Sequence, residues 1–181
     1  MFNYYRYEYL ISEGLEEEFI QNYSEAIKKY SDAITSIPYK TTGYYFRALC
    51  YVGQLNYVNA MDDFNMAILL NPGNYSFIIN RGFTKLELNE NNSALLDFNE
   101  GIKLNPNNKD AYELRAITKE RILDFEGAID DLGIAILLSP EDHYLFEKRA
   151  LLKERAMDFN GAVNDLSIAI KLYPFKSDLY F

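Results

Sequence analysis

The stretch that decides the fold is residues 57–72, which read YVNAMDDFNMAILLNP. Its main apolar residues fall three, four, seven, ten and eleven positions after Tyr57. This spacing places them on one face of an α-helix. Pro72 closes the stretch, because proline cannot extend the helical hydrogen-bond ladder and biases the preceding residue away from the α conformation. The stretch therefore predicts an amphipathic helix that ends before Pro72.

The same pattern returns along the chain with a constant 34-residue step. All five prolines keep this step, and so do columns of alanine, of isoleucine, of large apolar residues and of small residues. The proline, large and small columns are, in that order, Pro38, Pro72, Pro106, Pro140 and Pro174; Tyr30, Phe64, Phe98, Leu132 and Leu166; and Gly14, Ala48, Gly82, Ala116 and Ala150. Five consecutive repeats of equal length therefore cover residues 7–176.

Each repeat predicts two helices joined by a short turn. In the second repeat, Tyr44, Ala48 and Tyr51 form a shorter apolar stripe, and residues 53–56 favour a turn. Small residues let two antiparallel helices approach closely, and the large column fills the adjoining space. The sequence thus predicts an all-α chain, a single domain over residues 1–181. Its helix–turn–helix repeats are bounded at 7–40, 41–74, 75–108, 109–142 and 143–176, and residues 177–181 either start a sixth repeat or form a frayed end.

This repeat length and the spacing of Ala60, Phe64 and Pro72 resemble the tetratricopeptide repeat. The resemblance covers essentially the whole chain. Three columns depart from the family pattern: the first helices open without tryptophan, arginines and Glu13 replace a leucine, and a later tyrosine is kept only as Tyr51. The resemblance implies a right-handed helical-repeat solenoid. Its first helices would line a concave groove that takes up a peptide or partner segment, as in a scaffold or adaptor.

By that resemblance, the groove is apolar in the first repeats and acidic in the last two. The apolar residues are Tyr45, Leu49, Val52, Ile79, Phe83 and Leu86, and the charged ones are Glu113, Glu120, Arg121, Glu147, Glu154 and Arg155. We therefore expect a protein or peptide partner with apolar anchors flanked by lysine or arginine. The alternative is that the apolar residues only pack between neighbouring first helices. A clamp for the acidic C-termini of heat-shock chaperones is not expected, because only Asn80 matches it.

The net charge of −9 and the single cysteine limit the classes of function. Strong negative charge disfavours nucleic acid and anionic membrane surfaces as partners. No apolar run is long enough to span a membrane. Cys50 excludes an internal disulfide and fits a reducing compartment, and no secretory signal is visible. These features predict a cytoplasmic location.

We expect no catalytic site, no cofactor and no metal centre. No glycine-rich loop is followed by Lys and Ser or Thr, so a phosphate-binding loop is not predicted. His143 is the only histidine and has no cysteine partner for zinc. Asp62 and Asp63 are adjacent, but Asp63 belongs to a repeating column, which indicates a structural role rather than acid–base catalysis.

Two opposite charges recur at one fixed spacing and predict a contact between the two helices of each repeat. Four repeats carry an arginine and then an aspartate, and the first repeat inverts the signs with Glu13 and Lys29. The four pairs are Arg47–Asp63, Arg81–Asp97, Arg115–Asp131 and Arg149–Asp165. The alternative is two independent columns of solvated charges, since exposed pairs contribute little.

The second functional hypothesis is a structural or self-assembly element, either an oligomer or a fragment of a longer array. A terminal repeat needs a cap with a polar outer surface, whereas Leu179, Tyr180 and Phe181 are apolar. On this hypothesis the chain forms a homo-oligomer through its C-terminal edge, whereas an adaptor is monomeric.

Overall fold

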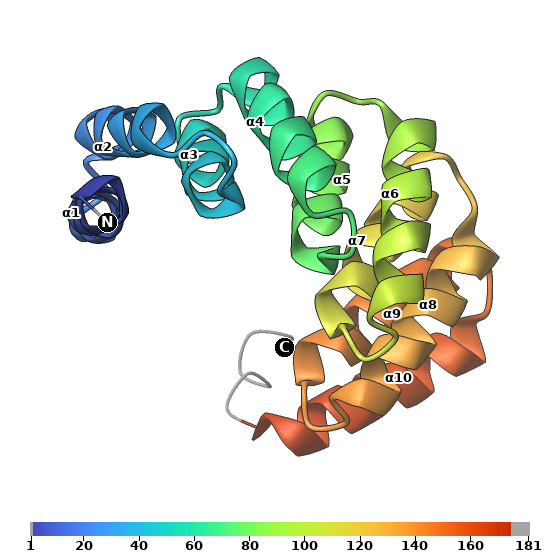
Figure 1. Ribbon diagram of the computed structural model, residues 1–181. Coiled ribbons are helices and arrows are strands. Elements are labelled where there is room, and N and C mark those ends of the chain that lie inside the picture. The colour runs from blue at the N-terminus through green and yellow to red at the C-terminus, as the bar shows by residue number, and fades with distance from the viewer. Residues whose placement is uncertain (1, 175–181) are drawn as a thin grey trace. The chain divides into compact units, whose positions relative to one another are not determined.

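The computed structural model describes residues 2–174, and these form ten α-helices and no strand (Figure 1). The helices are α1 (Phe2–Phe19), α2 (Tyr23–Ser36), α3 (Thr41–Gly53), α4 (Tyr57–Leu70), α5 (Tyr75–Glu87), α6 (Asn91–Leu104), α7 (Lys109–Arg121), α8 (Phe125–Leu138), α9 (His143–Arg155) and α10 (Phe159–Leu172). Successive pairs of helices follow the repeat step of the sequence. The predicted all-α, helical-repeat fold class is confirmed.

The chain divides into two compact units, Met1–Glu100 and Gly101–Phe181, which we call the N-terminal and C-terminal units. In the N-terminal unit, α1 to α5 each pack against the helix that follows or precedes them in the chain. In the C-terminal unit, α7 to α10 pack in the same way. Both units are therefore built by stacking neighbouring helices.

The small and large columns meet between the two helices of a repeat, as predicted. Ala48 and the rings of Tyr30, Phe64 and Phe98 are completely buried. A methyl group added to Gly82 would lie only 2.9 Å from Cε1 of Phe98. The small residue is thus needed because the large side chain of the partner helix occupies the space beside it.

The turn inside each repeat has the same backbone geometry in all five repeats. One residue of each turn adopts the left-handed conformation, with φ between 58° and 65°. These residues are Gln21, Leu55, Asn89, Leu123 and Met157. Because they are spaced by one repeat length, the repeat extends to the backbone of the turn.

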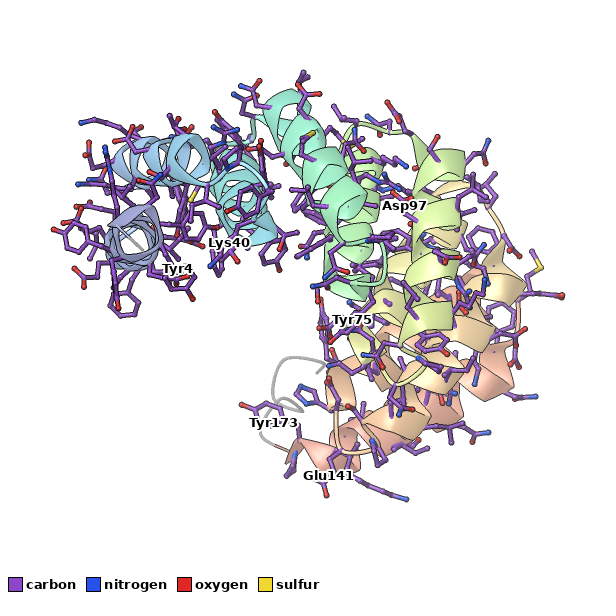
Figure 2. All side chains as sticks on the ribbon, in the orientation of Figure 1. Tyr4, Lys40, Tyr75, Asp97, Glu141 and Tyr173 are labelled. Carbon is purple, nitrogen blue, oxygen red and sulfur yellow. The ribbon has the colours of Figure 1, made fainter. Side chains whose placement is uncertain are left out.

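Opposite charges join the two helices of each repeat, which confirms the predicted pairing. In the third repeat, Nε and Nη2 of Arg81 donate to the two carboxylate oxygens of Asp97 at 2.8 and 2.7 Å, and Asp97 lies between α5 and α6 (Figure 2). In the first repeat the signs are inverted, and Nζ of Lys29 donates to Glu13 at 2.7 Å. The other pairs are Arg47–Asp63, Arg115–Asp131 and Arg149–Asp165.

The aspartates of these Arg–Asp pairs are buried, with 1 to 5% of their surface exposed. The arginines also reach the second helix of the preceding repeat, because Nη1 of Arg47 donates to Ser31 at 2.9 Å and Nη1 of Arg81 donates to Asn65 at 3.0 Å. Each of these two arginines thus connects three helices. The alternative of two independent columns of solvated charges is therefore excluded for the Arg–Asp pairs.

A second cation contacts the buried aspartate in the last three repeats. The Nζ atoms of Lys85, Lys119 and Lys153 lie 2.8 to 2.9 Å from the aspartate of their own repeat. The second repeat has Tyr51 at the position of these lysines. Its aspartate, Asp63, forms its ion pair with Arg47.

The pKa values of Asp63, which contacts one cation, and Asp165, which contacts two, shift in opposite directions. Burial raises the pKa of Asp63, and the hydrogen bond from Arg47 only partly offsets this effect. Burial also acts to raise the pKa of Asp165, but hydrogen bonds from Arg149 and Lys153 outweigh it and lower that pKa. Asp165 therefore stabilises the fold above its ordinary pKa, and this contribution is lost as the pH falls through the folded-state value. Asp63 has the opposite sign, since its contribution is present at low pH and is lost as the pH rises.

The first prediction concerns the strength of the Arg–Asp pairs. In a double-mutant cycle of Arg81→Met and Asp97→Asn, measured by equilibrium urea unfolding, we expect a coupling energy of about 1 to 3 kcal/mol. The reason is that Asp97→Asn leaves Arg81 without its counter-charge, and Arg81→Met leaves the buried Asp97 carboxylate with Lys85 in place of two cations. The exposed pair of Glu25 and Lys28 on α2 is the control and should give a coupling energy near zero. A coupling for Arg81 and Asp97 no larger than that control would contradict the account.

The second prediction concerns the missing lysine. Tyr51→Lys should lower the pKa of Asp63 below its ordinary value, because a second cation would then contact the carboxylate. The free energy of unfolding should accordingly rise more steeply from about pH 3 to 6 than in the wild type. The reciprocal change, Lys153→Tyr, should raise the pKa of Asp165. Carboxyl ¹³C NMR titration measures both pKa values, and an Asp63 pKa that does not respond to Tyr51→Lys would refute the explanation.

Candidate functional site

The side chain of Tyr45 on α3 is held in a fixed position within the N-terminal unit. Its ring centroid lies 4.9 Å from that of Phe77 and 6.2 Å from that of Phe64. Nδ2 of Asn80, on α5, donates to the Tyr45 hydroxyl at 3.4 Å. Burial raises the pKa of this hydroxyl, so the group stays neutral. Tyr45 is half-buried and thus presents a rigid aromatic edge with a polar tip.

The other predicted apolar groove residues fall into two classes. Leu49, Val52 and Phe83 are half-buried, and the first two pack beside a buried cluster that contains Phe64. Ile79 and Leu86 are buried, with 7% and 1% of their surfaces exposed. Tyr45, Leu49, Val52 and Phe83 therefore remain as the partly accessible apolar side chains of this set, while Ile79 and Leu86 serve mainly in packing.

Two of the predicted acidic residues of the C-terminal unit form ion pairs between first helices. Glu113 on α7 accepts from Nζ of Lys148 on α9 at 3.0 Å, and Lys109 lies 3.3 Å from the same carboxylate. Glu120 on α7 pairs with Arg155 on α9. These contacts neutralise part of the negative charge expected here.

Glu147 and Glu154, both on α9, line one open cavity of about 340 Å³ between α9 and α10. Leu151 of α9 and Leu166 of α10 form apolar parts of the same cavity. Glu154 is exposed and Glu147 is half-buried. Arg121, the remaining predicted residue, is exposed on α7 and is not among the residues that line this cavity.

Sequence reasoning missed Lys148 and Leu166. The signal for Lys148 was present, because its distance along the chain from Glu113 equals that of Arg155 from Glu120 and of Asn80 from Tyr45. Leu166 belongs to the large column, whose other members are at most 2% exposed, yet 41% of its surface is accessible. Membership of that column predicted an interior position for it.

The described residues offer little for catalysis or metal binding. Burial raises the pKa of the Cys50 thiol to about 12, which disfavours the reactive thiolate. Within residues 2–174, no group of three or more His, Cys, Asp or Glu side chains is placed to hold a metal ion.

None of the helices in the described part of the chain combines the length and the apolar character needed to cross a bilayer.

Comparison with known proteins identifies similar folds. No protein-family model and no curated protein sequence matches the chain. MamA residues 41 to the end, from Desulfovibrio magneticus RS-1, is 15% identical with a TM-score of 0.87, and the match covers 95% of this chain and 97% of that chain. YrrB, described as a TPR protein with an unusual peptide-binding site, is 19% identical with a TM-score of 0.76 and coverages of 91% and 85%. PilF of Pseudomonas aeruginosa is 14% identical with a TM-score of 0.83 and coverages of 94% and 78%. The chain therefore has the fold of the tetratricopeptide-repeat proteins.

Proposed function

We propose that the chain is a non-catalytic protein-interaction module that binds a peptide or partner segment on its first helices. The observation that carries this proposal is the set of half-buried apolar side chains Tyr45, Leu49, Val52 and Phe83 on α3 and α5. Tyr45 is fixed by neighbouring rings, so little conformational entropy is lost when a partner packs against it. The peptide-binding site described for YrrB supports the same kind of function.

The charge of the C-terminal unit supports a partner that also carries basic residues. Glu113 and Glu120 pair with cations of α9, whereas Glu147 and Glu154 border the open cavity, and the exposed Glu154 would contact Lys or Arg of a partner. Such contacts near the surface set association rate and register more than affinity. We therefore propose a partner with apolar anchors and flanking lysine or arginine residues.

The binding surface is tested with a panel of labelled peptides that share apolar anchors and differ in having Lys or Ser flanks. Phe83→Ala should weaken binding of the best peptide at least about tenfold, because truncating an aromatic anchor removes a main source of affinity. Fluorescence anisotropy measures the affinities, and circular dichroism checks that helix content is kept. The matched control is Tyr39→Ala, an exposed aromatic outside the α3 and α5 helices, which should leave affinity unchanged. Equal loss in both variants, or none in Phe83→Ala, would refute the proposed surface.

A self-assembly element is the second candidate function, and the end of the C-terminal unit favours it. Helix α10 exposes 41% of Leu166, 45% of Ile170 and 39% of Leu172. Leu179, Tyr180 and Phe181, on which the expected homo-oligomer edge rested, lie outside the described residues. The exposed apolar residues of α10 support association of the chain through this end.

A further inference from the structure

Glu18, near the end of α1, carries a half-buried carboxylate in the N-terminal unit. It stands one repeat length before Val52 and three before Glu120, so it belongs to a column of predicted groove residues. The Tyr30 hydroxyl of α2 donates to Oε2 of Glu18 at 2.8 Å. Because Tyr30 is completely buried, this hydrogen bond holds the carboxylate from the interior of the repeat while part of Glu18 stays accessible.

Two polar groups of α3 lie near this carboxylate. Burial raises the pKa of the Cys50 thiol, and the charge of Glu18 and a hydrogen bond with it raise that pKa further. Burial also raises the pKa of the Tyr45 hydroxyl, and the charge of Glu18 adds to this effect. Both groups therefore stay protonated and neutral near pH 7. The charge of Glu18 thus acts on the part of α3 that presents Tyr45.

The chain supplies a cation to the equivalent carboxylate of another repeat, but not to Glu18. Among residues 2–174, no lysine, arginine or histidine forms an ion pair with Glu18. Glu120, in contrast, pairs with Arg155, which follows it by 35 residues. The residue at the same distance after Glu18 is Gly53. The carboxylate is therefore repeated, whereas its cation is not.

Packing accounts for the glycine at the position of the missing cation. A Cβ atom added to Gly53 would lie 2.7 Å from Cζ of Tyr23. The Tyr23 side chain packs against the buried cluster that contains Tyr30. An arginine in place of Gly53 would therefore displace the Tyr23 ring from this contact. Helix α3 thus does not offer Glu18 the cation that α9 offers to Glu120.

We propose that the partner segment places a lysine or arginine on Glu18, beside Tyr45. This inference rests on the proposed binding surface of α3 and α5, and it names the class of residue that the partner carries at one point of that surface. An ionised carboxylate has about four acceptor positions, and Tyr30 and Cys50 leave room for a further donor. Because the carboxylate is already held in place and partly removed from water, its attraction for a cation is stronger than that of a fully exposed glutamate.

Other residue classes do not fit this point. An apolar side chain packed on Glu18 would remove water from the carboxylate without replacing its hydrogen bonds. An acidic side chain would be repelled by it. The structural alternative is that Glu18 serves only to accept the hydrogen bond from Tyr30. In that case, removing the charge of Glu18 leaves the choice of partner unchanged.

The probe is a phage-displayed library of random short peptides, selected against the full chain and against Glu18→Gln. In this variant the side-chain amide oxygen can still accept from Tyr30, but the charge is gone. Peptides selected by the wild type should carry Lys or Arg at a fixed distance from their apolar residues. Those selected by Glu18→Gln should keep the apolar residues and lose this preference. The matched control, Glu16→Gln, removes an exposed carboxylate of the same helix and should select as the wild type does.

One peptide selected by the wild type is then titrated by fluorescence anisotropy, with circular dichroism to check the helix content. Glu18→Gln should weaken its binding at least about tenfold. Replacing the cation of the peptide by Gln should weaken binding to the wild type equally and have little further effect in Glu18→Gln.

Three outcomes would overturn the inference. The first is that peptides selected by Glu18→Gln keep the cation, and the second is that Glu16→Gln loses as much affinity. The third is that the wild type selects apolar residues with no preferred cation, which would leave the proposed surface at Phe83 intact. If no peptide is selected at all, both the inference and the proposed function are contradicted.

Discussion

In four of the five repeats, a buried aspartate needs its cations in place for the two helices to pack. Each of Asp63, Asp97, Asp131 and Asp165 accepts two hydrogen bonds from an arginine on the other helix of its repeat. A carboxylate removed from water is costly unless it is paired and hydrogen-bonded. Because a bidentate arginine–carboxylate pair has a defined geometry, the pair helps to align the two helices of its repeat. The small and large columns then set their separation.

This requirement divides the acidic residues of the chain into two classes. The aspartates of the Arg–Asp pairs are placed inside the repeats, where water and partners do not reach them. Glutamates on the first helices lie in more accessible positions, and two of them, Glu113 and Glu120, are used to join α7 to α9. Glu147 and Glu154 occupy the equivalent positions one repeat later and border an open cavity. We propose that this chemistry, which serves packing in one repeat, contributes to partner binding in the next.

Much of this architecture was predictable because it recurs with a fixed step. Pro72 and Phe64 indicated a helix and its end, and the inverted signs of Glu13 and Lys29 showed that charge pairing was the preserved property. The site was less predictable. The burial of Ile79 and Leu86 depends on how closely neighbouring helices pack, which a column of apolar residues does not specify. The exposure of Leu166 depends on the absence of a covering helix among the described residues, whereas its sequence column is that of an interior residue.

The division of the carboxylates into structural and binding groups is the central claim, and one comparison tests it most directly. Asp131→Asn and Glu154→Gln make the same chemical change in the same unit, one in an Arg–Asp pair and one beside the open cavity. Equilibrium urea unfolding should show a loss of about 3 to 5 kcal/mol for Asp131→Asn, because Arg115 and Lys119 lose their buried counter-charge. Glu154→Gln should change the free energy of unfolding by less than about 0.5 kcal/mol. Losses of similar size in the two variants would contradict the account.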